Sequence, residues 1–455
     1  MTDTPSQLDR RRFLQGALGA AGAGLALSGP FTALGARVAG AGGARPAAAG
    51  DGGYGPLFPA KDQTTGLELL RLPRGFEYMS LSWRNDPMSD GSPTPSSHDG
   101  MCAFRDGDVV RLVRNHERGV GTPFAAADAT YDPQASGGTT SLVFHPDRGE
   151  LVEVHASLSG TIRNCAGGNN AGNAWLSCEE TTDIVDGTRH GYIFRVPITG
   201  ASNAEPIVGM GRFSHEANAT DPATGIVYET EDSGSSALYR YVPTDPAHLA
   251  AGGVLRAMAL DGTTDTRLWE TGTSAAASWV VVDSPDWGPG EPSPWQQVQA
   301  KGAARIVRGE GAWYGNGLIY MISTSGGASG QGQVFAYDPV GSTFTCVFAS
   351  PSSDVLNNPD NVTVSPRGGL VLCEDGSGLE YLHGLTPDGA IFRFAENAIV
   401  LPPEFEQTKG YSGDFTSSEW AGATFEPKNG NWLFVNIQSP GVTFAITGPW
   451  RRGAL

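Results

Sequence analysis

The stretch Asn173-Ala174-Trp175-Leu176-Ser177-Cys178-Glu179-Glu180 is a short apolar run that ends in two acids. Two other runs end in the same way, at Thr230-Glu231-Asp232 and at Cys373-Glu374-Asp375. Short runs of aromatic, β-branched and small residues are typical of strands, so the pattern predicts a repeated β unit. Equivalent strand ends meet at one rim when such units are arranged radially. Because crowded carboxylates repel one another unless protons or cations neutralise them, the recurring acids predict a metal site.

The rest of the chain repeats this unit. Turns such as Gly315-Asn316-Gly317 join paired strands, and a third strand follows the acids, as in residues 192–197 and 238–243. Helical periodicity is scarce after residue 50. About six such units lie between His98 and Thr447 at loose spacings, which is the pattern of a propeller. The predicted fold class is therefore all-β: a six-bladed β-propeller with long top-face loops.

The chain divides into two unequal parts. Residues 1–49 contain Arg10-Arg11-Arg12-Phe13-Leu14 and then a Gly/Ala-rich stretch without charge until Arg37, which predicts a twin-arginine export signal. Glycines and Pro30 dilute this stretch below the hydrophobicity of a spanning helix. We therefore expect a partner in the twin-arginine translocase, a secreted or periplasmic location, and no membrane anchor after signal cleavage. Residues 50–455 are expected to form one domain, in which residues 252–307 are either a lid or a packed surface loop.

Charge and cysteine content narrow the function classes. The whole chain carries −18, and residues 1–49 hold two Asp against five Arg, so the remainder carries −18 − 3 = −21. Such a surface disfavours nucleic acid and anionic membranes as partners and suits an exported protein that binds cations. None of the five cysteines forms a Cys-x-x-Cys pair, and an odd count leaves at least one thiol free or metal-bound. The five are Cys102, Cys165, Cys178, Cys346 and Cys373.

Each unit also opens with a polar phrase, at the place where the innermost strand of a blade begins. Side chains there are expected to point into the mouth of the central channel. One carboxylate or carboxamide per blade makes an oxygen-rich ring that suits calcium, and a thiolate among them adds a ligand for a softer or redox-active metal. The phrases are His98-Asp99-Gly100, Asn164-Cys165-Ala166-Gly167-Gly168, Ser214-His215-Glu216-Ala217, Arg308-Gly309-Glu310, Asn358-Pro359-Asp360-Asn361 and Ser418-Glu419-Trp420.

In this order, the opening and closing phrases resemble the PhoX-type alkaline phosphatase family. The resemblance runs from the export signal, through these phrases and Phe434-Val435-Asn436-Ile437-Gln438-Ser439-Pro440-Gly441, to Trp450. It implies a six-bladed propeller that hydrolyses small-molecule phosphate monoesters with two ferric ions and three calcium ions. A monomer is expected.

The resemblance also implies roles for individual residues. Cys178 resembles the family's iron-binding cysteine, and Glu179 beside it is expected among the metal ligands. Glu216 and Glu310 resemble metal-bridging carboxylates. Arg308 resembles the arginine that holds the substrate phosphate.

A further motif of the family matches the fifth unit. Asp360 and Glu374 are expected there as metal ligands, and Asn361 as a substrate contact. One stretch departs from the family: Asn169-Asn170-Ala171-Gly172 stands where many relatives carry Thr-Pro-Trp-Gly, which removes an aromatic residue beside the metals.

The remaining thiols and histidines leave two roles open. Cys165 and Cys373 can be read as ligands, although the apolar run around Cys373 favours a buried, inert thiol. Cys102 and Cys346 lie in strand-like runs and are expected in the core. The pairs His98-Asp99 and His116-Glu117 either bind metal or brace a blade, and bracing is favoured.

Two other functions compete with an iron- and calcium-dependent phosphatase. A calcium-only propeller hydrolase of the lactonase or phytase kind needs the acids but has no use for a thiolate. A non-catalytic propeller that binds a sugar or a protein needs calcium only as a structural staple, and it needs Arg308 only for an ion pair.

Overall fold

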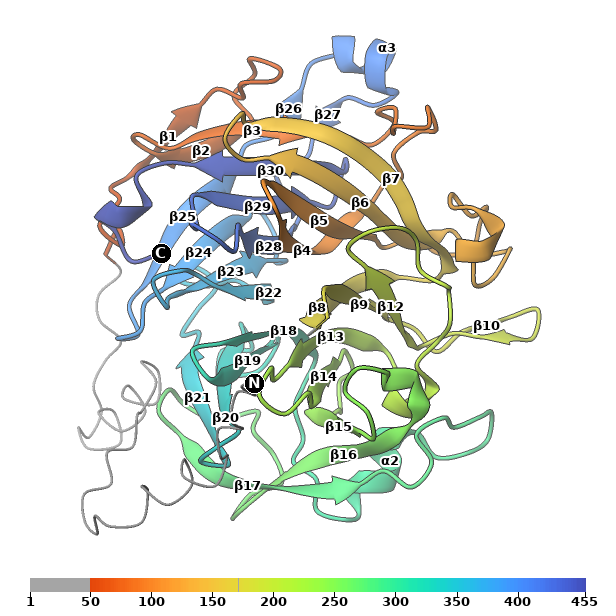
Figure 1. Cartoon of the computed structure of the whole chain (residues 1–455). Coiled ribbons are helices and arrows are strands. Elements are labelled where there is room, and N and C mark those ends of the chain that lie inside the picture. Colours follow the sequence, from red (N-terminus) through yellow and green to blue (C-terminus); the bar gives the residue numbers. More distant parts are fainter. Residues whose placement is uncertain (1–49, 171) are drawn as a thin grey trace, which may run out of the picture.

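A computed structural model describes residues 50–170 and 172–455, and strands dominate this part of the chain (Figure 1). The predicted export signal, residues 1–49, lies outside the described residues. Within the described residues no helix is long and apolar enough to cross a membrane. All five cysteines are buried and unpaired.

The first strands of successive sheets form a closed ring. Each contacts the next, and the last contacts the first, so that within the described residues six inner strands surround the centre of Figure 1. A closed ring of inner strands is the arrangement of a β-propeller, and the all-β propeller prediction is confirmed. The inner strands are β4 (His98–Asp106), β8 (Asn164–Asn170), β13 (His215–Thr220), β18 (Gly309–Gly315), β22 (Pro359–Val364) and β28 (Trp420–Phe425).

Antiparallel hairpins continue outward from each inner strand. The first three sheets add β5 (Val109–His116), β6 (Gly137–His145) and β7 (Glu150–Thr161); β9 (Ala174–Glu179) and β12 (Ile193–Pro197); and β14 (Val227–Glu231), β15 (Tyr239–Pro243) and β16 (Gly253–Leu260). The last three add β19 (Leu318–Ser323), β20 (Gln333–Asp338) and β21 (Thr343–Ala349); β23 (Leu370–Glu374), β24 (Tyr381–Leu385) and β25 (Ile391–Asn397); and β29 (Trp432–Ile437) and β30 (Val442–Thr447). Apolar side chains from facing sheets pack between them, and full burial of each large one stabilises the fold by roughly 1.5–3 kcal/mol.

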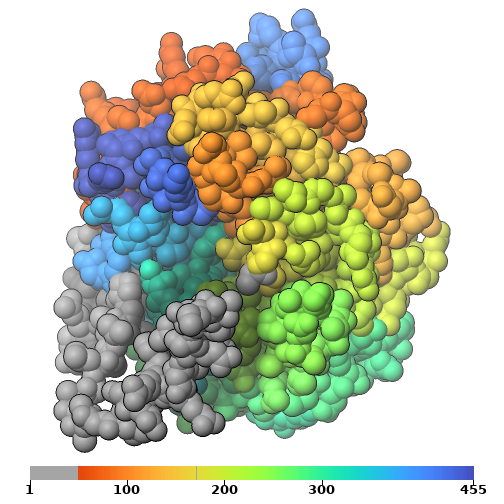
Figure 2. Space-filling model, viewed as in Figure 1, coloured from red at the N-terminus to blue at the C-terminus, as the bar shows by residue number. Residues whose placement is uncertain are grey.

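Strands from the two ends of the described chain complete the ring. β3 (Glu77–Leu81) pairs antiparallel with β30, with Tyr78 opposite Ile446. β1 (Leu57–Ala60) and β2 (Leu70–Pro73) extend the neighbouring sheet beyond β25. The red and blue parts of the chain accordingly lie side by side in Figure 2. This pairing covers edges that would otherwise expose unpaired backbone groups.

The long insertion, residues 252–307, is built into the outer edge of the ring. β17 (Ser274–Val281) pairs with β16 on one side and β21 on the other, which joins the third and fourth sheets into one nine-stranded sheet. The short helix α2 (Pro294–Gln299) follows, with Ser293 as its N-cap and Val298 buried. This arrangement supports a packed surface segment rather than a lid.

Short elements complete the described part of the chain. They are β10 (Ile184–Val185), β11 (Thr188–Arg189), β26 (Val400–Leu401), β27 (Gly413–Asp414), α3 (Glu404–Lys409), η1 (Ala127–Ala129), η2 (Val208–Met210), η3 (Leu249–Ala251) and η4 (Trp450–Arg452).

A β-bulge recurs near the start of all six inner strands. The register shifts by one residue after His98, Asn164, His215, Gly309 and Pro359, and between Ala421 and Thr424. A bulge leaves one residue unpaired and changes where side chains point. The repeated bulge therefore turns equivalent residues of different sheets towards the same mouth.

Candidate metal and phosphate site

Five inner strands place a thiol or an acid at their second position, directly at the bulge. These residues are Asp99, Cys165, Glu216, Glu310 and Asp360, and all five are buried. In the sixth inner strand Ala421 takes this position, and Glu419 lies just before the strand.

Four of these five residues converge with Glu180, which directly follows β9, in two overlapping groups. One group contains Cys165, Glu180 and Glu216, and the other contains Glu216, Glu310 and Asp360; within each, the ligand atoms lie within 4.8 Å of one another. Glu216 belongs to both groups, and its Oε1 lies 3.2 Å from the Cys165 Sγ. We call the five residues of these two groups, Cys165, Glu180, Glu216, Glu310 and Asp360, the mouth cluster.

Side chains of neighbouring strands hold the bulges in place. Asn115 on β5 donates its Nδ2 to the Cys165 and Ala166 carbonyls, at 3.1 and 2.7 Å. Thr230 on β14 donates its hydroxyl to the Glu310 carbonyl at 2.6 Å. Bulge carbonyls that lack a ladder partner are thereby satisfied, and the residues that carry them are fixed in orientation.

At each acidic strand end, the two successive acids point to different places, the first into its own sheet and the second towards the mouth. The first acid of each pair points back into its own sheet and accepts hydrogen bonds there. Glu179 accepts from the backbone N–H groups of Ile162, Gly191 and Tyr192, at 2.8 to 3.1 Å, and lies 2.6 Å from His190 Nδ1. Its oxygens are therefore occupied by the protein itself.

Glu374 repeats this arrangement in the fifth sheet. It accepts from the backbone N–H groups of Asn357 and Tyr381, at 2.7 and 3.0 Å, and lies 2.9 Å from His383 Nε2. The structure thus places Glu179 and Glu374, both predicted as metal ligands, outside the mouth cluster and in a bracing layer behind it.

The second acid of each pair faces the mouth instead. Glu180 is a member of the mouth cluster, and Asp232 and Asp375 interact electrostatically with its members. Of these three phrases, the sequence predicted metal ligands in two, Glu179 and Glu374, which are the first acid of each pair. Alternation along a strand was the available signal, because adjacent side chains point to opposite faces.

Burial and mutual repulsion dominate the electrostatics of the mouth cluster. Burial, together with the charges of Glu117 and Asp232, raises the pKa of Glu180 to about 9, although the neighbouring Arg163 opposes this. Burial, together with Asp375 and Asp232, raises the pKa of Asp360 to about 7. The pKa values of Glu216 and Glu310 are raised well above the usual range for the same reasons, burial first.

These residues fit metal ions by their chemistry. Glu216 Oε2 is fully buried and has no hydrogen-bond partner among the described residues. An unpartnered buried carboxylate oxygen is costly unless a proton or a cation satisfies it. Carboxylates suit hard cations such as calcium, and the Cys165 thiol, once deprotonated, suits iron.

The two cysteines of the second sheet lie in different surroundings. Cys178 packs in an apolar cluster with Leu176 and Ile193, and the Nδ2 of Asn218 lies 3.3 Å from its Sγ. Burial raises the pKa of the Cys178 thiol. The structure does not bring Cys178, the predicted iron ligand, to the mouth cluster; the thiol that it places there is Cys165.

Arg308 lies at the rim of the mouth and is 44% exposed. Its Nε and Nη2 pair with the two oxygens of Asp232 at 2.8 and 3.0 Å, and Nη2 also lies 3.0 Å from Glu310 Oε1. A half-exposed guanidinium beside a carboxylate cluster presents planar donors that match a phosphoryl group. Asn361, the other predicted substrate contact, is buried on β22 directly after Asp360, and its role stays a prediction.

In the first sheet, the two members of the pair His116-Glu117 point in different directions. His116 lies 2.9 Å from the Ser96 carbonyl and 2.8 Å from the Thr140 hydroxyl, so it braces the sheet as favoured. Its neighbour Glu117 faces the mouth, where the Nε2 of Gln438 donates to it and to Asp99.

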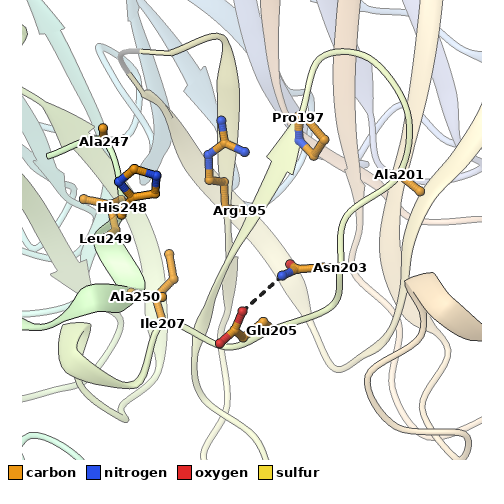
Figure 3. A pocket seen from close by; sticks show the side chains of 10 residues that line it. All are labelled: Arg195, Pro197, Ala201, Asn203, Glu205, Ile207, Ala247, His248, Leu249 and Ala250. Carbon is orange, nitrogen blue, oxygen red and sulfur yellow. Dashed lines mark hydrogen bonds between the residues drawn. The ribbon is translucent and has the colours of Figure 1, made fainter. Parts of the chain in front are cut away.

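A separate hollow lies between β12 and η3 (Figure 3). Arg195, Glu205 and His248 line it together with small and apolar residues, and Asn203 donates a hydrogen bond to Glu205. None of the mouth cluster residues lines this hollow.

Comparison with known proteins completes the description of the site. The family model described as alkaline phosphatase PhoX matches residues 52–157 and 150–441. Among solved structures, PhoX of Pseudomonas fluorescens, in complex with the transition state analogue vanadate, matches with a TM-score of 0.62 and 17% identity, over 88% of this chain and 98% of that chain. A gluconolactonase of Xanthomonas campestris matches with a TM-score of 0.43 and 14% identity, over 87% and 98%. A search of curated proteins found no match.

Proposed function

The chain belongs to the alkaline phosphatase PhoX family, whose members hydrolyse phosphate monoesters, and from this membership we propose that it acts at an iron–calcium cluster held in the mouth of the propeller. The observation that carries the proposal is the convergence of five buried side chains in two adjoining groups that share Glu216. They are Cys165, Glu180, Glu216, Glu310 and Asp360. The fold alone would not require five such groups there.

The donor set divides naturally between two kinds of ion. Cys165, with Glu180 and Glu216, would hold iron, since a thiolate is the softest ligand of the cluster. Glu216, Glu310 and Asp360 would hold calcium, with Asp99, Asp232, Asp375 and Glu419 around them. When bound, such ions neutralise the charge of a phosphoryl group and activate an oxygen nucleophile. In this proposal Cys165 takes the role that the sequence assigned to Cys178.

The chain's own residues position the substrate. Arg308 would bind two phosphoryl oxygens through Nε and Nη2, the donors that now pair with Asp232. Its contacts strengthen as negative charge shifts on the phosphoryl oxygens, so Arg308 would contribute to rate as well as to affinity. Asn361, beside Asp360, would donate its amide to the same substrate. The acids of the mouth repel an anionic ester until cations neutralise them, so metal binding would precede substrate binding.

The cellular setting follows from residues 1–49. We propose that the twin-arginine translocase exports the folded protein, which then acts on small phosphate esters outside the cytoplasm. The strongly acidic mature surface would keep the protein away from nucleic acids and anionic membranes.

Chelation tests this proposal most simply. The purified protein should contain iron and calcium by elemental analysis and should hydrolyse p-nitrophenyl phosphate. Removal of both metals should abolish hydrolysis, and their joint return should restore it. Full activity in the metal-free protein, or restoration by calcium alone, would contradict the iron–calcium proposal.

A further inference from the structure

Two arginines occupy the same position in different sheets. Arg163 directly precedes β8 and Arg308 directly precedes β18, and both have left-handed backbone conformations, with φ of 51° and 46°. A left-handed conformation costs a non-glycine residue roughly 1–2 kcal/mol. The same conformation occurs directly before β4 and β22, at Ser97 and Asn358, so it belongs to the repeated unit. At Arg163 and Arg308 the side chain at this position is 48% and 44% exposed.

Arg163 contacts the mouth in the same manner as Arg308. Its Nε lies 3.1 Å from Glu117 Oε1, and its Nη2 lies 2.5 Å from Glu180 Oε2. Among the described residues no hydrogen-bond partner contacts its Nη1. The Arg163 guanidinium therefore pairs with two acids of the mouth through Nε and Nη2, while its Nη1 side faces solvent.

A pair of carboxyl groups connects the two arginines. Arg163 pairs with Glu180, Arg308 pairs with Asp232, and these two acids repel each other electrostatically. The two guanidinium groups thus contact different carboxyl groups of the mouth. Since each arginine pairs with a different carboxyl group, the two guanidinium groups offer separate positions for anionic groups.

We propose that Arg163 binds a second anionic group, carried by the alcohol part of the phosphate ester. The preferred substrates are then phosphate monoesters with an additional carboxylate or phosphate, rather than esters of neutral alcohols. The inference rests on the proposed function, in which Arg308 would hold the phosphoryl group and Glu180 would hold a metal ion instead of pairing with Arg163. A guanidinium released in this way is free to pair with a ligand carboxylate or phosphate.

A matched pair of substrates tests the proposal. Both 3-phosphoglycerate and glycerol 3-phosphate are small monoesters, but the first carries a carboxylate where the second carries a hydroxymethyl group. The metallated wild-type enzyme should show a higher kcat/KM for 3-phosphoglycerate. Arg163→Gln should lower the ratio of the two kcat/KM values by about tenfold or more, the effect of losing one hydrogen bond to a charged group. Arg163→Lys should retain part of the preference.

Controls separate substrate binding from a merely structural role. Arg195→Gln removes an arginine of the outer hollow in Figure 3 and should leave the ratio unchanged. Equal losses on both substrates in Arg163→Gln would show that Arg163 only balances Glu117 and Glu180, which would overturn the inference. A wild-type ratio near one would also overturn it, while leaving the phosphatase proposal intact. Failure of the metallated wild-type enzyme to hydrolyse p-nitrophenyl phosphate would instead overturn the proposed function, and this inference with it.

Discussion

The mouth cluster and the bracing layer behind it contain the same residue types but satisfy them differently. In the bracing layer, protein donors occupy the oxygens of Glu179 and Glu374, and Cys178 lies among apolar side chains. In the mouth cluster, Glu216 keeps a buried oxygen without a partner, and Cys165 faces acids. Residue type alone therefore does not distinguish the two sets of residues; the convergence of several buried ligand atoms within 4.8 Å of one another does.

Replacement of Glu216, which both groups of the mouth cluster share, should distinguish the mouth cluster from the bracing layer most clearly. Glu216→Gln removes the carboxylate that belongs to both groups of the mouth cluster, so it should deplete bound metal and lower kcat at least about a thousandfold. Glu179→Gln is the matched control in the bracing layer. It weakens buried hydrogen bonds worth about 1–3 kcal/mol, so it should lower the Tm but retain metal. Equal metal loss in both variants, by elemental analysis, would contradict the distinction between the two layers.

Replacement of Arg308, which we propose to bind the substrate phosphate, should separate catalysis from metal binding. Arg308→Ala should lower kcat/KM for p-nitrophenyl phosphate by roughly 100- to 1000-fold, because charge-assisted contacts to the transition state are lost. Inhibition by inorganic phosphate should weaken by about 2–4 kcal/mol, and metal content should persist. Arg308→Lys should recover only part of the activity, since it keeps the charge but not the planar fork. Unchanged kcat/KM and phosphate inhibition in fully metallated Arg308→Ala would remove Arg308 from the site.

The pH dependence of stability should show the repulsion within the mouth cluster, as a smaller effect than the losses of activity above. In the folded, metal-free protein, the pKa values of Asp360 and Glu180 are raised to about 7 and about 9. In the unfolded chain both carboxyl groups have ordinary pKa values. Between the ordinary pKa values and the raised ones, the folded state holds protons that the unfolded state has lost. Stability should therefore fall as pH rises from about 5 to about 9.

Thermal unfolding with and without chelator measures this effect. The Tm of the chelated protein should decrease across that pH window, and Glu180→Gln should reduce the decrease at its upper end. Bound metal should weaken or reverse the trend, because cations stabilise the deprotonated carboxylates. A chelated protein whose Tm rises with pH would contradict the assigned repulsion.

The sequence predicted the propeller because its strand runs, turns and acidic ends recur in order. It also named Glu216, Glu310 and Asp360, which the structure brings together. It did not separate Glu180 from Glu179, or Cys165 from Cys178. Neighbouring residues at a strand end point to opposite faces of the sheet, and a bulge reverses the face to which the following residues point. Long-range contacts, such as the hydrogen bond from Asn115 to the Cys165 carbonyl, decide that orientation, and one strand's sequence does not contain them.

The most direct test of the central claim compares the two cysteines of the second sheet. Cys165→Ser and Cys178→Ser should be purified with their metals, and iron content and visible absorption should be measured in parallel with the wild-type protein. We predict a thiolate-to-iron charge-transfer band in the wild-type protein. Cys165→Ser should lose this band together with iron, and Cys178→Ser should keep both. Loss of iron and absorbance in Cys178→Ser but not in Cys165→Ser would contradict the placement of the metal site at the mouth cluster.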